Sequence, residues 1–424
     1  MLEKLRIKIY NLLRWSEKYI KTDMVYLAKG GGWLMLGRIV AMLAAFGLSI
    51  AFANLLTKEV YGQYRYVISI VNFLILFTLS GMGTAVFRAA SQGKDGIIKS
   101  AIKTEIRWGL LGSVAALLLA VFYYWKGDYV LAPAFFVISF FAPFLNVYNL
   151  YASVLQGKKR FDLLVRYDVL TQFGNFILIL PALFITKQIW ILILPVLLIN
   201  SVLQKVWLWR SEKNVVFNQV DDKDAIKYGK HLSLMGVISL IGDSIDQIII
   251  FNWLGPVQFA IYNMALAPTE QIKGGIKMII PLAFPKIAQQ TTEVLRKSLN
   301  AKVMRFLIFL ATGVVIYIIL AKWLFGIFFP QYSESVVYSQ WFAASLLASS
   351  ATLYTTALQA HGASRVLYWY NSVMAIVQIF LFFVLIYFYG LLGAVAARVI
   401  IRFFGSLLSY ICWRRFCRSE SNML

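Results

Sequence analysis

Long apolar stretches separated by short polar segments follow one another along almost the entire chain. A helix needs about 20 apolar residues to cross roughly 30 Å of hydrocarbon, because each residue adds about 1.5 Å along the helix axis. By this criterion we expect twelve membrane-spanning helices. They cover residues 32–56, 65–90, 106–125, 130–155, 162–186, 189–210, 231–254, 257–285, 305–328, 336–360, 364–389 and 391–412.

The composition also predicts an all-α integral membrane protein. Of the 424 residues, 60% are hydrophobic and 14% are charged, whereas about 25% of residues in soluble domains carry a charge. A soluble fold of this length has too little interior to bury so much apolar surface. The longest connection, residues 211–230, is too short to fold by itself, so we expect no catalytic domain outside the membrane.

The net charge of +22 would suggest a nucleic-acid partner in a soluble protein, but its distribution favours another explanation. Both termini and the connections on their side hold 30 Lys and Arg, whereas the opposite connections hold four: Lys58, Arg65, Lys126 and Lys187. Basic connections stay in the cytoplasm. We therefore expect cytoplasmic termini, no nucleic-acid partner, and contacts between the basic connections and anionic membrane lipids.

The chain also contains an internal repeat. LYASVLQ at 150–156 matches LYTTALQ at 353–359, and NLLTKEVYGQY at 54–64 matches NWLGPVQFAIY at 252–262. The two offsets, 203 and 198 residues, are nearly equal, and each match lies at the equivalent place in a six-span unit. Six is an even number, so the two units share one orientation in the membrane. Carriers built from parallel repeats bind their substrate between the halves and move one half against the other.

This pattern predicts five segments. They are an interfacial amphipathic segment (1–30), an N-terminal six-helix lobe (31–210), a cytoplasmic linker (211–230), a C-terminal six-helix lobe (231–413) and a cytoplasmic tail (414–424).

Several charged residues lie inside the expected spans, where topology does not explain them. A charge at the centre of a span costs about 2.5–3.5 kcal/mol and usually faces a cavity or a partner. Arg88 and Lys322 lie near the ends of their spans, where their side chains can reach the headgroups. The deeper basic residues are Arg38, Lys273, Lys277, Arg398 and Arg402, and the acidic residues are Asp243, Asp246 and Glu270.

Two interpretations of these residues stay open. In the structural one, Asp243 and Asp246 form buried salt bridges with the lysines of the next helix. In the functional one, the five basic residues line a cavity that binds an anion, because arginine makes forked hydrogen bonds to phosphate. The acids would then couple transport to an ion. Both interpretations hold if a salt bridge opens when the substrate arrives.

At these residues the sequence resembles the O-antigen and teichuronic-acid type of polysaccharide flippases, within the multidrug/oligosaccharidyl-lipid/polysaccharide exporter superfamily. The similarity rests on segments such as AKGGGWLMLGR (28–38), NLLTKEVYGQYRYVISI (54–70), DQIIIFNWLGPVQFAIYNMALAP (246–268), LQAHGASRVLYWYN (358–371) and YGLLGAVAARVI (389–400).

The resemblance implies a V-shaped, two-lobed bundle of twelve helices in the bacterial inner membrane. It implies a cargo of undecaprenyl-diphosphate-linked oligosaccharide, flipped from the cytoplasmic to the periplasmic leaflet by alternating access. Partners would be the membrane lipids, a polysaccharide polymerase and chain-length machinery. Since the chain has no GxxxxGK[ST] phosphate-binding loop, the energy would come from a gradient of Na⁺ or H⁺.

Two alternatives remain. A multidrug exporter of the same superfamily would take cationic drugs and show an acidic cavity. A membrane polysaccharide polymerase would need acid or base residues at a water-facing site, but the outer connections carry only Glu59, Asp128 and Glu334 as acids. The sequence has no residue spacing typical of a metal site. We therefore expect a transporter and not an enzyme, with no cofactor and no metal.

Overall fold

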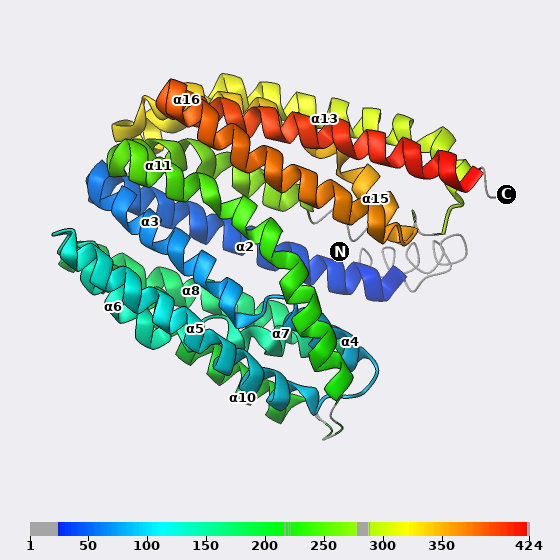
Figure 1. Ribbon diagram of the computed structural model, residues 1–424, viewed down its shortest axis with the longest axis horizontal. Helices are drawn as coiled ribbons and strands as arrows, with labels where there is room; N and C mark the ends of the chain where they lie inside the picture. Colours follow the sequence, from blue (N-terminus) through cyan, green and yellow to red (C-terminus); the bar gives the residue numbers. More distant parts are fainter. Residues whose placement is uncertain are drawn as a thin grey trace, which may run out of the picture.

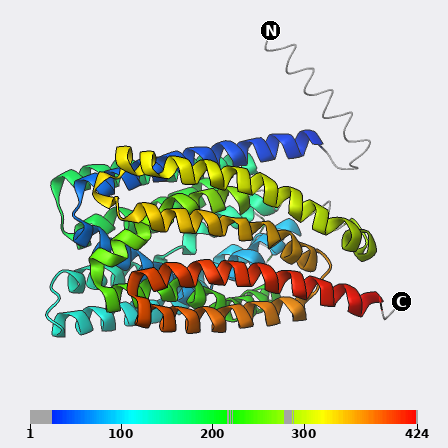
Figure 2. The same ribbon diagram turned by 90° about the horizontal axis from the view of Figure 1, so that it is seen from above.

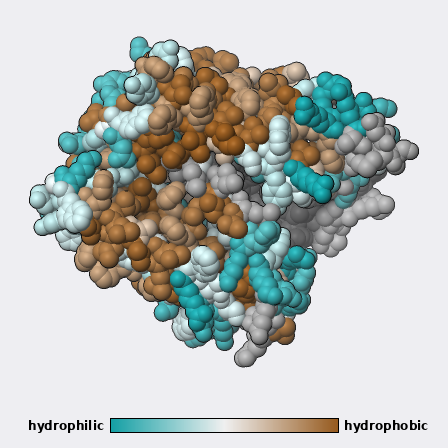
Figure 3. Space-filling view, in the orientation of Figure 1, coloured by the Kyte–Doolittle hydropathy of each residue, from teal (hydrophilic) through white to brown (hydrophobic). Residues whose placement is uncertain are grey.

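The computed structural model describes residues 24–215, 218, 220, 222–277, 287 and 289–421. This part of the chain is all-helical and contains no β-strand. Eight of its helical segments are long and apolar enough to cross a membrane. On the surface, apolar side chains form a broad area between hydrophilic residues at the two ends of the molecule (Figure 3). The expected amphipathic segment lies mostly outside the described residues.

The N-terminal half consists of helices joined by short turns. They are α2 (Met24–Leu55), α3 (Lys58–Leu74), η1 (Ile75–Thr78), α4 (Met82–Ser91), α5 (Ile97–Trp125), α6 (Leu131–Phe141), η2 (Ala142–Phe144), η3 (Val147–Asn149), α7 (Leu150–Gly157), α8 (Phe161–Ile185), α9 (Ile189–Leu198), the π-helical η4 (Ile199–Leu203) and α10 (Gln204–Asn214).

Two of the spans expected here are not continuous helices. The segment expected at 65–90 breaks at Leu79 (φ 58°), and the segment expected at 130–155 breaks at Asn146 (φ 60°). A residue in the left-handed conformation cannot continue a right-handed helix, so the chain leaves the helix axis at both points. Hydropathy reports only that such a segment is apolar, and it does not detect the break.

The C-terminal half contains two very long helical elements. Its elements are α11 (Lys223–Lys277), α13 (Thr292–Phe328), η5 (Pro330–Tyr332), α14 (Ser335–Ser345), η6 (Leu346–Ala351), α15 (Thr352–Ala360) and α16 (Ser364–Ser421).

Both α11 and α16 turn at an interior glycine. Gly255 has φ 84° and ψ 173°, and Gly390 has φ 56° and ψ −131°. Glycine adopts such angles without the steric cost that a side chain brings. Beyond Gly390 the helix doubles back, so that the two halves of α16 lie side by side (Figures 1 and 2). We call the end of the molecule with these glycines the elbow end, and the end where α2 begins and α16 ends the termini end.

The two halves of the chain meet closely at the elbow end. Asn54 donates a hydrogen bond to the carbonyl oxygen of Phe328 (3.0 Å), and Lys58 forms an ion pair with Glu334 (3.2 Å). Gly62 of α3 lies against the backbone of Pro256, where a Cβ atom would come within 1.9 Å of the carbonyl oxygen. These contacts close the elbow end.

The connection between the halves is fastened at the termini end. Asn218 accepts a hydrogen bond from the backbone nitrogen of Asp95 (2.9 Å), and Gly96 donates one to Val220 (3.0 Å). Lys94 lies 2.7 Å from a carboxylate oxygen of Asp222 and holds the pKa of that carboxyl below its usual range. The described part of the connection is therefore docked on the turn between α4 and α5.

Candidate functional site

Charged side chains gather where α11 packs against α16. Asp246, from the first half of α11, is fully buried. One of its carboxylate oxygens accepts hydrogen bonds from Tyr262 (2.8 Å) and from Arg398 of α16. Its other oxygen has no hydrogen-bond partner among the described residues. Burying a carboxylate in this way is costly unless a cation lies beside it, and Arg398 supplies that cation.

Glu270 lies on α11 beyond the turn at Gly255 and is the centre of the same network. It accepts a hydrogen bond from Arg402, lies 3.9 Å from Arg398 and lies 3.6 Å from Lys273. Arg402 also donates to the hydroxyl of Ser345 (2.7 Å). Three basic side chains thus share two carboxylates, so the network carries one excess positive charge when all five groups are ionised.

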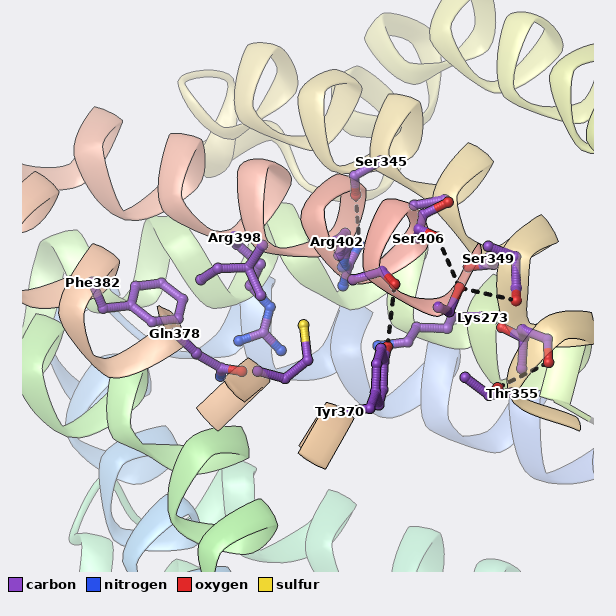
Figure 4. A pocket seen from close by; sticks show the side chains of 17 residues that line it. Lys273, Ser345, Ser349, Thr355, Tyr370, Gln378, Phe382, Arg398, Arg402 and Ser406 are labelled. Atoms are coloured by element: carbon purple, nitrogen blue, oxygen red, sulfur yellow. Dashed lines mark hydrogen bonds between the residues drawn. The ribbon is translucent and has the colours of Figure 1, made fainter. Parts of the chain in front are cut away.

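The basic side chains line a cavity of about 250 Å³ inside the C-terminal half (Figure 4). Lys273, Arg398 and Arg402 line it together with hydroxyl groups from α14, η6, α15 and α16. The polar groups that line it besides the three cations are Ser345, Ser349, Thr352, Thr355, Tyr370, Gln378, Ser406 and Ser409. Such a lining offers charge and many hydrogen-bonding groups to an anionic or hydroxyl-rich ligand.

A second cavity, of about 300 Å³, lies between the two halves of the chain. Arg65 of α3 and Asn263 of α11 meet in it, with 3.4 Å between the guanidinium and the amide oxygen. The Nε atom of Arg65 is buried and has no hydrogen-bond partner among the described residues. Glu270 lines this cavity while it binds Arg402 of the first one, so it connects the two.

Sequence reasoning missed Arg65 because it placed this residue in a connection. The helix in fact begins at Lys58, where the side chain of Thr57 caps the backbone of Val60, and Arg65 lies two turns inside it. A usable signal was present: Arg65 and Asn263 are 198 residues apart, the offset of the internal repeat. Two repeats related by an axis, as the sequence predicts, would bring equivalent positions near that axis together, so this pair could have been predicted.

The other predicted residues have the following positions. Arg38 lies in α2, Asp243 in the first half of α11 and Lys277 at the end of α11, and the side chains of all three lie outside the described residues. One interpretation expected Asp246 to pair with a lysine of the next helix, and the structure pairs it with Arg398 of α16 instead.

Membrane-length helices surround an ion-pair network and two polar cavities, an arrangement typical of membrane transport proteins, where charges inside the membrane often mark substrate or ion pathways. Residues 27–291 match the sequence model of the family described as polysaccharide biosynthesis protein, and the chain belongs to this family. No curated protein matches the sequence.

The fold is similar to that of solved membrane transporters. An inward-facing multidrug resistance MATE family transporter of the MOP superfamily superposes with a TM-score of 0.64 at 13% identity, over 91% of this chain and 96% of the other. The Vibrio cholerae MATE transporter VcmN gives 0.60 at 15% identity, over 93% and 97%. The lipid II flippase MurJ, inward closed, gives 0.57 at 12% identity, over 90% and 86%. The resemblance inferred from the sequence is confirmed.

Proposed function

We propose that this protein flips an undecaprenyl-diphosphate-linked oligosaccharide from the cytoplasmic to the periplasmic leaflet of the bacterial inner membrane. The observation that carries the proposal is the network of three basic and two acidic side chains, with Asp246 fully buried and the other four partly buried, beside a polar cavity. Membership in a polysaccharide biosynthesis family supports the class of cargo. A cargo delivered to the outer leaflet would be available to a polysaccharide polymerase and chain-length machinery.

The proposed topology has twelve spans in two parallel six-helix repeats, with the termini end in the cytoplasm. The turns at Gly255 and Gly390 support this count, because each divides one long helical element into two membrane-length pieces. The contact between the repeat-related residues Arg65 and Asn263 supports an axis between the two lobes, 31–210 and 231–413. The closed elbow end supports a cavity that opens toward the cytoplasm.

In the proposed mechanism, the diphosphate is held by the basic residues Arg38, Lys273, Lys277, Arg398 and Arg402. Arg402 now donates to Glu270, and a phosphate oxygen that takes over this bond releases the carboxylate. A carboxylate without its cation in a low-dielectric site takes up H⁺ or Na⁺. Asp243, Asp246 and Glu270 are the proposed coupling residues, and substrate entry is linked in this way to ion binding.

The charge of the network argues against the multidrug exporter. A cationic drug would meet an excess of positive charge, which repels it, whereas a diphosphate is attracted. The similarity to MATE transporters, at 12–15% identity, concerns the fold and gives no information on the cargo.

A reconstitution experiment tests the proposal. The purified protein is placed in liposomes that contain a polyprenyl-diphosphate oligosaccharide in the inner leaflet, and the sugar that reaches the outer leaflet is captured by an added lectin. We expect lectin-accessible sugar to appear faster than in protein-free liposomes, and faster still with an ion gradient. Efflux of a cationic dye without movement of the oligosaccharide would overturn the proposal.

A further inference from the structure

A basic pocket outside the candidate transport site lies between α8 and α10, near the termini end. Its volume is about 290 Å³, and Arg166, Arg210 and Lys213 line it from the two helices. The remaining lining residues are Leu163, Tyr167, Leu170, Trp209 and Asn214. None of the described residues that line this pocket is acidic.

The three basic side chains are not engaged in ion pairs with described residues, unlike their neighbours. Arg160, the residue just before α8, makes two hydrogen bonds to Asp162 (both 3.0 Å). Lys158 likewise pairs with Asp95 (2.5 Å). Topology accounts for basic residues at this end of the molecule. Topology does not explain why three basic side chains line one pocket that has no acidic residue among its described lining.

The wall of the pocket is fixed by contacts between the two helices. Tyr167 stacks on Trp207, with 4.7 Å between ring centroids and an interplanar angle of 9°. The indole nitrogen of Trp207 donates to Thr171 (2.9 Å), and Asn214 donates to the hydroxyl of Tyr167 (3.1 Å). The pocket therefore exists before a ligand binds, and little ordering is needed on binding.

Two of the cations are held over aromatic rings of α10. The ammonium of Lys213 lies 3.7 Å from the ring centroid of Trp209, and the guanidinium of Arg210 lies 5.6 Å from the ring centroid of Trp207. Cation–π contacts restrain the side chains without neutralising their charge. The positive groups thus remain available to an anion.

Exposed apolar side chains continue from the pocket toward the middle of both helices. On α8 they are Leu170, Phe173 and Ile177, spaced so that they share one face, and on η4 and α10 they are Val202 and Val206. A basic pocket that opens onto such apolar stripes has the two parts that a phospholipid needs, one for the headgroup and one for the acyl chains.

We propose that this pocket binds the phosphate headgroup of an anionic phospholipid, and that the acyl chains lie along the apolar stripes of α8 and α10. The cargo diphosphate has the same chemistry, but the position of the pocket favours the phospholipid. None of the residues that line this pocket lines either cavity of the candidate transport site, and α8 contributes to the second cavity only Ile179, which lies 13 residues beyond Arg166.

Native mass spectrometry of the purified full-length protein tests this proposal independently of transport. Phosphatidylglycerol is titrated against the wild type and against a triple variant, Arg166→Gln, Arg210→Gln and Lys213→Gln. Each basic residue near a lipid surface contributes about fivefold to the affinity. We expect the triple variant to lose about a hundredfold in affinity for the first bound lipid, and phosphatidylcholine to bind both proteins equally weakly.

A matched control removes the same charge from the same end of the molecule. Lys99, Lys103 and Arg107 lie on one exposed face of α5 and line none of the cavities described above. Their triple exchange to Gln should leave the first phosphatidylglycerol bound with wild-type affinity. Equal losses in both triple variants, or no loss in either, would overturn the proposal.

Two further measurements separate the remaining outcomes. Undecaprenyl diphosphate is added in competition, and its displacement of phosphatidylglycerol at equal concentration would assign the pocket to the cargo and overturn the phospholipid proposal. The single variant Lys213→Gln changes one exposed side chain and should lose about fivefold in affinity while it keeps the wild-type thermal unfolding temperature. Wild-type affinity in this variant would count against the proposal even if the triple variant fails to fold.

Discussion

At the scale of single residues, Asp246 is the buried acid whose loss should affect coupling most. The variant Asp246→Asn keeps the volume of the side chain but leaves Arg398 without its nearest carboxylate, a loss of about 3 kcal/mol in stability for a buried pair. We expect flipping in proteoliposomes to lose its dependence on an imposed proton gradient. Tyr262→Phe, which removes one hydrogen bond and no charge, should retain this dependence. An unchanged gradient response in Asp246→Asn would reject a role in proton coupling.

Arg402 connects the cavity, Ser345 and Glu270, so its removal should stop transport. We expect Arg402→Ala to insert in the membrane at wild-type levels and to abolish flipping, because the cavity loses a phosphate ligand and Glu270 loses its closest cation. The measurement is surface polysaccharide in cells that carry only the variant. Lys322→Gln, on an exposed position of α13, is the matched control and should behave as the wild type. Full polysaccharide production with Arg402→Ala would refute the assignment.

Arg65 provides a test of the cavity between the halves. A hydrogen bond to a charged group contributes about 1.5–3 kcal/mol. If Arg65 contacts the cargo, Arg65→Gln should raise the cargo concentration for half-maximal flipping roughly 10- to 100-fold. Arg65→Lys should recover part of the lost affinity, because lysine restores the positive charge but not the pair of parallel hydrogen bonds that a guanidinium makes. Half-maximal flipping at the wild-type concentration in Arg65→Gln would contradict a contact with the cargo.

The sequence predicted the members of the charged network better than their partners. A charged residue inside an apolar span is easily recognised in the sequence because its neighbours are apolar. Asp246, Glu270, Arg398 and Arg402 were found in this way. Which acid pairs with which base depends on how α11 and α16 pack. The spacing of residues along one helix gives no information about that packing. Arg65 was missed for a different reason: its helix begins earlier than the hydropathy indicates.

At the scale of helices, the close approach of α3 to the turn of α11 depends on Gly62. A Cβ atom here would lie 1.9 Å from the carbonyl oxygen of Pro256, a backbone atom that cannot rotate away. We expect Gly62→Ala to push the two helices apart and to cost about 1–3 kcal/mol, seen as a lower thermal unfolding temperature. Gly313→Ala on α13, where no atom lies within 4 Å of the added Cβ, is the control and should be neutral or stabilising. Equal unfolding temperatures of the two variants would show that the contact is looser than described.

Helix positions were easier to predict than helix shapes. An apolar run of sufficient length predicts that a segment crosses the membrane, because the unpaired backbone groups of any other conformation are too costly in lipid. Leucine rarely adopts a positive φ, so the residue type gave no warning of the break at Leu79. Asparagine adopts a positive φ more often, so Asn146 was a weak signal of the second break. The turn at Gly255 was anticipated only as the limit between two hydrophobic runs.

At the scale of the whole molecule, two sets of contacts restrain the halves at opposite ends. At the elbow end, Asn54, Lys58 and Gly62 hold the N-terminal half against the C-terminal half. At the termini end, the described part of the connection is docked on the turn after α4 through Asn218 and Asp222. Alternating access requires that the elbow end separate, while the docked connection keeps the start of α11 on the N-terminal half.

A cross-link across the elbow end should therefore stop transport without affecting folding. Lys58 and Glu334 form an exposed ion pair between the halves, and such a pair contributes little to stability, so both residues tolerate replacement. In a background with Cys412→Ser and Cys417→Ser, the variant Lys58→Cys with Glu334→Cys is treated with a short bifunctional thiol reagent. We expect flipping to stop once the link forms and to continue after treatment with a monofunctional reagent of similar size, which modifies both thiols but leaves the halves free. Continued flipping by the fully cross-linked protein would show that the elbow end does not open during transport.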